Sequence, residues 1–133
     1  MAKTKTILFL LTLLCSLHAL SQIPKMTQEE KERYRKISRA SAKVSADNSR
    51  TVYHLANSLT KNCETDLEKT RAIFVWIASN ITYDMVAFKA GEYPDYNARS
   101  VLKNKSGLCE GYARLFHALA TEADIKSEII MQK

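Results

Sequence analysis

Cysteine is scarce in this chain of 133 residues, which has only three, at positions 15, 63 and 109. So few cysteines exclude the disulfide framework that is typical of small secreted domains. The sequence has no CxxC pair, no histidine and cysteine cluster at metal-ligand spacing, and no acidic loop with calcium-site spacing. We therefore expect no metal and no cofactor. One bridge between Cys63 and Cys109 stays open as an alternative to two free thiols.

The chain also lacks an apolar run that could span a bilayer, for which about 20 residues are needed. A short apolar run over residues 7–17 follows Lys3 and Lys5, and small residues precede a cleavage point after Ser21. This pattern is typical of a secretory signal peptide. We predict that residues 1–21 are a signal peptide, that the protein is secreted or periplasmic, and that no stable membrane span remains after cleavage. An uncleaved anchor is the alternative.

A basic stripe is missing as well. The net charge is +6, and loss of Lys3 and Lys5 with the signal peptide lowers it to +4. The basic residues are scattered among acidic ones, so nucleic acid is not an expected partner. With 46% hydrophobic and 26% charged residues, the composition is that of a globular protein, and the mature length allows one small domain.

Two capping boxes predict where helices begin. Thr27 with Glu30 starts a mostly charged helix that runs to Val44, and Thr65 with Glu68 starts a second one. The first helix has only a thin apolar stripe, so we expect it to lie over the domain with much of its surface in solvent. We assign residues 22–48 to this polar helix and its linker, which ends in the turn and capping cluster Asp47-Asn48-Ser49.

The remaining residues, 49–133, form one predicted unit. Helical spacing favours a helix over 50–60 and one that ends near Asn80, whose broad apolar face comprises Leu67, Ala72, Ile73, Val75, Trp76 and Ile77. Residues 81–88 fit an extended segment or a short helical turn equally well. A loop, a short helix over 98–103 and a polar turn follow. The last helix opens at Leu108 or Cys109, and alternation over 125–131 predicts a half-buried strand.

The segment with the strongest chemical signal is SGLCEGYA, in which Cys109 lies at the predicted helix start. A helix N-terminus carries partial positive charge and unpaired backbone N–H groups, which stabilise a thiolate and an oxyanion. Gly107 allows a sharp entry without a clashing side chain, and Gly111 allows another group to approach the helix closely.

The run SGLCEGYARLFHALATEADI resembles the nucleophile helix of transglutaminase-like domains. KTRAIFVWIASNITYD resembles the tryptophan-bearing helix that precedes it in the kyphoscoliosis-peptidase-like branch. The resemblance covers residues 50–133 and implies that Cys109 is the nucleophile in amide-bond chemistry, either hydrolysis or acyl transfer, on a protein or peptide substrate. The implied fold class is α+β, a truncated transglutaminase-like or papain-like fold, mostly helical here with one C-terminal strand.

Two departures from this family pattern qualify the prediction. The family continues after the cysteine helix with strands that carry a histidine and an aspartate, whereas this sequence ends at Lys133. We therefore expect an incomplete fragment that is inactive by itself, because an unassisted thiol with a pKa of about 8.5 is mostly protonated at neutral pH. Asp124 replaces the glycine usual at the helix exit, and aspartate tolerates the left-handed conformation better than most residues.

The histidines present do not replace the missing base. His18 leaves with the signal peptide, and His117 is eight positions beyond Cys109, about 12 Å along the same helix. His54 reaches Cys109 only if the tertiary fold brings it there. A surface or half-buried helix position is the plainer interpretation of His117.

Other candidate residues each have a structural interpretation that we prefer. Trp76 fills the core beneath the cysteine helix, and Glu110 faces solvent or pairs with a cation. Tyr112 packs in the core instead of donating to an oxyanion. Tyr83 and Asp84 either line a cleft or, by default, act as a packed ring and a capping acid.

The alternative function is that of a non-catalytic exported binding module or pseudoenzyme. Without further strands, one face of the helix of Trp76 and of the cysteine helix stays uncovered. An exposed apolar patch of this kind needs a partner or a dimer.

Overall fold

The computed structural model describes residues 25–45 and 51–130. The chain divides into two units, residues 1–31 and 32–133. Of the first unit, residues 25–31 are described, and they contain the predicted capping box. The backbone N–H of Thr27 donates to Glu30 Oε2 over 2.7 Å, and that of Glu30 donates to Thr27 Oγ1 over 3.1 Å. These bonds satisfy two donors at the start of helix α2 (Gln28–Ala42).

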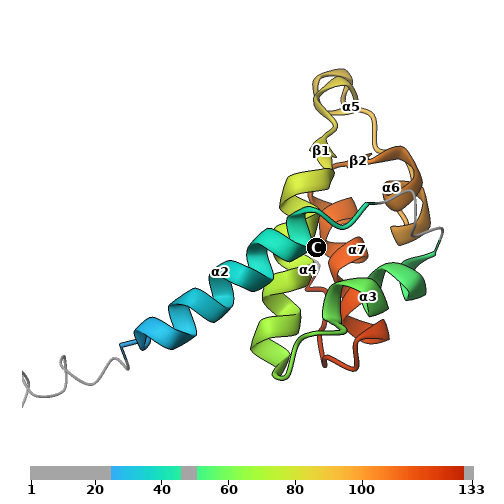
Figure 1. Cartoon of the computed structure of the whole chain (residues 1–133). Helices are drawn as coiled ribbons and strands as arrows, with labels where there is room; N and C mark the ends of the chain where they lie inside the picture. The colour runs from blue at the N-terminus through green and yellow to red at the C-terminus, as the bar shows by residue number, and fades with distance from the viewer. Residues whose placement is uncertain (1–24, 46–50, 131–133) are drawn as a thin grey trace, which may run out of the picture. The chain divides into compact units, whose positions relative to one another are not determined.

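The second unit is built around helix α7 (Cys109–Glu122), which packs against three other helices. Its neighbours are α3 (Val52–Thr60), α4 (Asp66–Asn80) and α6 (Ala98–Asn104). Figure 1 shows these four helices together. Six large side chains are fully buried among them, namely Leu55, Ile73, Trp76, Val101, Leu115 and Leu119.

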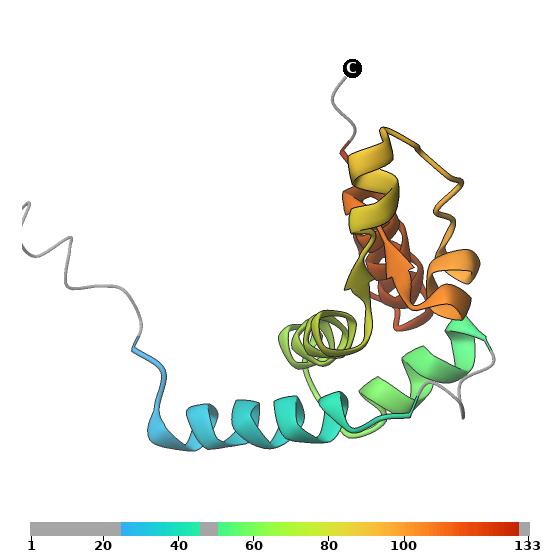
Figure 2. The same cartoon turned by 90° about the horizontal axis from the view of Figure 1, so that it is seen from above.

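Two short parallel strands pair with each other and connect α4 to α7. Strand β1 (Thr82–Tyr83) follows α4, and β2 (Ser106–Gly107) leads into α7, with Thr82 opposite Ser106. Figure 2 shows the two strands side by side. Between them lies α5 (Met85–Ala90), with Asp84 as its N-cap. Residues 81–88 are therefore first extended and then helical, which combines the two predicted alternatives.

Helix starts agree well with the sequence prediction. Thr65 and Glu68 form the second capping box, and α4 ends at Asn80 as predicted. Helix α3 begins at Val52 with Thr51 as its N-cap, whereas the predicted cap cluster at 47–49 lies outside the described residues. The predicted signal peptide at 1–21 also lies outside them. Among the described residues, no helix is long and apolar enough to cross a membrane.

The mostly helical α+β architecture is confirmed, but the predicted strand at 125–131 is wrong in detail. Residues 125–130 form no strand, and no strand in the described part of the chain pairs with them. Burial still alternates along them, with Ile125, Ser127 and Ile129 half-buried and the residues between them exposed. The side-chain pattern of a strand is therefore present without a ladder, because a ladder needs a second strand. Asp124 adopts the expected left-handed conformation with φ 58°.

The buried face of α4 is narrower than predicted. Ala72, Ile73, Trp76 and Ile77 are buried, whereas Leu67 is 63% exposed. Leu67 and Phe74 are seven positions apart, so they share a helix face that the neighbouring helices do not cover. Asn80, the last residue of α4, is not left-handed. The helix leaves instead through Ile81, whose backbone is extended.

Candidate active site around Cys109

Cys109 is the first residue of α7, and its side chain is exposed. The strand pair holds the chain just before it. The N–H of Thr82 donates to Lys105 O over 2.9 Å, and the N–H of Asp84 donates to Gly107 O over 3.1 Å. Leu108, which is buried, then leads into the helix with an extended backbone. The predicted position of the thiol in the first helical turn is therefore confirmed.

Helix α7 differs from the other described helices in its cap. The side chains of Thr27, Thr51, Thr65, Asp84 and Asn97 accept hydrogen bonds at the starts of α2 to α6. The N-cap of α7 is Leu108, which makes no such bond. The first intrahelical bond runs from Tyr112 N to Leu108 O over 3.1 Å. The N–H groups of the first turn are therefore not covered by a capping side chain, and they can stabilise negative charge beside Cys109.

The two glycines that flank Cys109 allow α6 to approach α7. A Cβ added at Gly111 would lie 2.9 Å from Tyr96 Cβ and 2.9 Å from Val101 Cγ2. One added at Gly107 would lie 3.3 Å from Val101 Cγ2. The close approach predicted for Gly111 therefore occurs, and the approaching groups are side chains from α6 and the loop before it. These contacts hold the start of α7 in place.

Tyr112 also anchors the first turn of α7. Its hydroxyl donates to Ile81 O over 2.7 Å, and its ring lies 6.4 Å from that of Tyr83. Burial raises the pKa of the Tyr112 phenol, with a smaller contribution from Tyr83. Because the hydroxyl proton already has an acceptor, Tyr112 has the packing role that we preferred over an oxyanion donor.

Asp84 and Glu110 also have structural partners. Asp84 caps α5 by accepting from Ala87 N over 3.0 Å, and it accepts from the Tyr96 hydroxyl over 3.0 Å. These two bonds, the first more strongly, lower the pKa of Asp84. Burial and then Asp84 raise the pKa of Tyr96. Glu110 pairs with Arg114 over 2.7 Å. The capping role predicted for Asp84 is confirmed, and so is the pairing of Glu110 with a cation.

Neither histidine among the described residues bonds to Cys109. His54 Nδ1 lies 2.8 Å from Thr51 Oγ1 in the first turn of α3. His117, within α7, has its Nδ1 2.8 Å from Oγ of Ser127, a residue that follows α7 in sequence. The half-buried position expected for His117 is confirmed. The described residues thus supply a thiol and its N–H groups, with no imidazole bonded to them.

Trp76 has the core role that we preferred. It is fully buried, and its Nε1–H donates to Val44 O over 2.9 Å. The ammonium group of Lys105 lies 5.3 Å from the centre of its ring. Trp76 thus connects the residues after α2, the core and the residue before β2.

Both described cysteines are free, so no bridge joins Cys63 to Cys109. Cys63 is half-buried, and its Sγ lies 3.8 Å from Leu59 O. Burial, followed by the charge of Glu68, raises the pKa of the Cys63 thiol. No group of three or more potential metal ligands occurs among residues 25–45 and 51–130.

An apolar groove lies between α4 and α7. It has a volume of about 320 Å³ and is lined by Phe74, Ile77, Ala78, Tyr112, Ala113 and Phe116. Ala113 follows Cys109 by four positions, so the two share a face of α7. The groove lies between the helix of Trp76 and the cysteine helix, the two helices for which the sequence predicted an uncovered apolar face.

Comparison with known proteins agrees with this geometry. The profile of the transglutaminase-like superfamily matches residues 53–132. Kyphoscoliosis peptidase from Homo sapiens is 32% identical over 72 residues, and that from Mus musculus is 31% identical over the same length. Each match covers 54% of this chain and 11% of the relative. No solved structure matches the chain.

The profile match includes both the tryptophan-bearing helix and the cysteine helix, the two segments on which the resemblance rests. This chain belongs to the transglutaminase-like superfamily.

Proposed function

We propose that Cys109 is the nucleophile of a thiol-dependent reaction at amide bonds of protein or peptide substrates. The observation that carries the proposal is an exposed thiol at the first residue of a helix whose N–H groups are not capped by a side chain. The kyphoscoliosis peptidases that match 72 residues of this chain support peptide cleavage, and the superfamily supports acyl transfer.

In the proposed reaction, the thiolate sulfur of Cys109 attacks the carbonyl carbon of the substrate. The electron pair of the C=O bond moves to oxygen, where first-turn N–H groups stabilise the negative charge. The C–N bond then breaks, and the leaving amine takes up a proton, which leaves a thioester on Cys109. Attack by water completes hydrolysis, whereas attack by a second amine completes acyl transfer, and either step regenerates the thiol.

An activated ester tests the nucleophile separately from the proton transfers, because p-nitrophenolate leaves without being protonated. The full chain is treated with p-nitrophenyl acetate, and acetylated peptides are quantified by mass spectrometry. We expect acetylation of Cys109 to be faster than that of Cys63. Cys63→Ser should keep the reaction, and Cys109→Ala should abolish it. Acetylation of Cys109 that is no faster than that of Cys63 would contradict the proposal.

The fate of the thioester separates the two reaction types. After acetylation, the protein is transferred to buffer with and without a primary amine. Release as acetate alone indicates hydrolysis, and release as the acetylated amine indicates acyl transfer. Both products require the Cys109 thioester, so either one supports the nucleophile.

We also propose that the protein is exported with cleavage after Ser21, on the basis of the N-terminal sequence pattern. N-terminal sequencing of the protein recovered from the medium or periplasm should give Gln22 as the first residue. Recovery in the cytoplasm with Met1 or Ala2 intact would overturn this proposal.

A second candidate function is a non-catalytic binding module, which the apolar groove between α4 and α7 favours. Phe74 in this groove is 63% exposed, so its ring is available for contact with a partner. If a second copy covers the groove, sedimentation should show a dimer that Phe74→Ser disrupts. Phe88→Ser, a matched change at an exposed residue outside the groove, should leave the dimer intact. A monomer at all concentrations, with an acylated Cys109, would favour the enzyme.

A further inference from the structure

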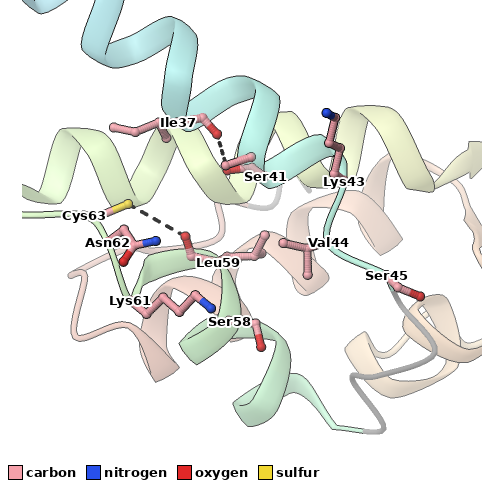
Figure 3. Close-up of a pocket in the computed structure, with 11 residues that line it drawn as sticks. Ile37, Ser41, Lys43, Val44, Ser45, Ser58, Leu59, Lys61, Asn62 and Cys63 are labelled. Atoms are coloured by element: carbon pink, nitrogen blue, oxygen red, sulfur yellow. Dashed lines mark hydrogen bonds between the residues drawn. The ribbon is translucent and has the colours of Figure 1, made fainter.

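A second pocket lies apart from Cys109, between the end of α2 and the end of α3. Figure 3 shows Val44 and Leu59 close together in it and Lys61 extending along α3 toward Ser58. Its volume is about 520 Å³, within the range of roughly 300–1,000 Å³ that is usual for ligand sites. Its lining residues come from 37–45 and 58–63, and none belongs to α7.

The walls of this pocket are held by specific contacts. Arg33 of α2 forms ion pairs with Glu68, which is buried, and with Glu64, the latter at 2.8 Å. At the other end of the wall, Trp76 Nε1–H donates to Val44 O. Two anchors therefore fix this stretch of chain against α4, so the pocket is largely formed before any ligand arrives.

The lining combines an apolar floor with polar groups at its edge. Leu59 is buried, and Ile37 and Val44 are half-buried, so together they offer an apolar surface. Ser58 is half-buried and Asn62 is exposed, and both add hydrogen-bond donors. This division suits a ligand with a hydrocarbon part and a polar end.

The charge of the lining has one sign. Lys43 and Lys61 line the pocket, and none of the described lining residues is an aspartate or glutamate. Within the described residues, neither lysine forms an ion pair, whereas Arg33, Lys69 and Arg114 do. An ammonium group without a carboxylate partner, next to an apolar floor, is complementary to an organic anion.

We propose that this pocket binds an aliphatic carboxylate, with its hydrocarbon chain on Ile37, Val44 and Leu59 and its carboxylate beside Lys61. Cys63 also lines the pocket, so a bound ligand shields its sulfur. Cys109 lies outside the pocket and serves as an internal reference in the same molecule.

Protection of Cys63 from alkylation tests this proposal. The full chain is treated with iodoacetamide at increasing octanoate concentrations, and alkylation of each cysteine is followed by peptide mass spectrometry. We expect octanoate to slow alkylation of Cys63 severalfold and saturably, while alkylation of Cys109 is unchanged. 1-Octanol, which has the same chain without the charge, should protect only at higher concentration.

Two variants that each lose one positive charge test whether the carboxylate of octanoate binds beside Lys61. Lys61→Gln should raise the half-protecting octanoate concentration about fivefold. Lys36→Gln, an exposed change on α2 outside the pocket, should leave it unchanged. Ala40→Trp should fill the pocket and abolish protection, with circular dichroism as the check on folding.

Several results would overturn the proposal. These are no protection of Cys63, equal slowing of both cysteines, equal protection by octanol and octanoate, or equal effects of Lys61→Gln and Lys36→Gln. All of these readouts concern Cys63, so they do not depend on whether Cys109 is a catalytic nucleophile.

Discussion

The hydroxyl of Tyr112 donates a hydrogen bond to the carbonyl oxygen of Ile81 over 2.7 Å. This bond joins the first turn of α7 to the residue that ends α4, across 31 positions of sequence. Tyr112 is three positions after Cys109, so the same bond orients the turn that presents the thiol. The candidate nucleophile is thus positioned by side chains that do not themselves take part in chemistry.

Tyr112→Phe should destabilise the fold by about 1–2 kcal/mol, because it leaves a part-buried carbonyl oxygen without its donor. Urea unfolding of the full chain measures the change. Tyr93→Phe is the matched control, since Tyr93 is 84% exposed, and it should change stability by less than about 0.5 kcal/mol. Equal stability of both variants would mean that the bond to Ile81 contributes nothing.

Gly111→Ala should destabilise the fold although alanine favours a helix. Helix propensity alone predicts a gain of about 1 kcal/mol. The new methyl group would instead lie 2.9 Å from Tyr96 Cβ and Val101 Cγ2, and the displacement of α6 should cost about 1–3 kcal/mol.

Thermal unfolding of this variant gives the sign of the effect. Ala113→Gly, at an exposed position two residues further along α7, is the control for propensity alone and should lose about 1 kcal/mol. A Gly111→Ala variant that is more stable than the unchanged protein would show that α6 can move away from the new methyl group at no cost in free energy.

Glu68 should make the free energy of unfolding depend on pH in the acidic range. Hydrogen bonds from Glu64 N and then Arg33 lower the pKa of this carboxyl in the folded protein. A lowered folded pKa contributes stability above the unfolded value of about 4.3, and this contribution is lost as the pH falls through the folded pKa. Urea unfolding between pH 7 and pH 3 should therefore show decreasing stability.

The variant Glu68→Gln should flatten this acid-dependent loss and lower stability at pH 7. Glu128→Gln removes the same charge at an exposed residue and should leave the pH profile unchanged. If the profiles of the two variants coincide, Glu68 is not the group responsible.

The two free thiols should differ in reactivity at neutral pH. Cys109 is exposed, whereas Cys63 is half-buried and burial raises its pKa. Because the thiolate is the reactive form, iodoacetamide should alkylate Cys109 faster at pH 7, and the rate at Cys63 should rise as the pH is raised. Peptide mass spectrometry of timed samples checks this order, and faster alkylation of Cys63 at pH 7 would contradict it.

Much of the local structure was predictable because it depends on residues close together in sequence. The capping boxes of Thr27 and Thr65 involve groups three positions apart, and both form as predicted. Cys109 at a helix start follows from the glycine before it and the helical spacing after it. The left-handed Asp124 is likewise a local property of a helix end.

The failures concern contacts between distant residues. Leu67 was predicted to be buried and is exposed, because α3 and α7 cover another side of α4. The parallel strands β1 and β2 pair residues that are 24 positions apart. A strand of two residues is too short to show a hydrophobic periodicity, so the sequence does not predict this pair. Residues 125–130 kept the predicted alternation without a ladder, since pairing requires a neighbour that alternation cannot specify.

By itself, the sequence determined where the helices start, that Cys109 stands in a first turn, and which superfamily the chain belongs to. Only the tertiary structure decided that Tyr96 and Val101 fill the space left by Gly111. It also decided that His54 and His117 form their hydrogen bonds with groups other than the thiol of Cys109. The pocket with lysine residues beside Cys63 likewise depends on the tertiary structure. The physical reason is the sequence separation over which each kind of interaction acts. Capping and helix periodicity act within one or two turns, whereas packing and pocket shape depend on which distant side chains meet.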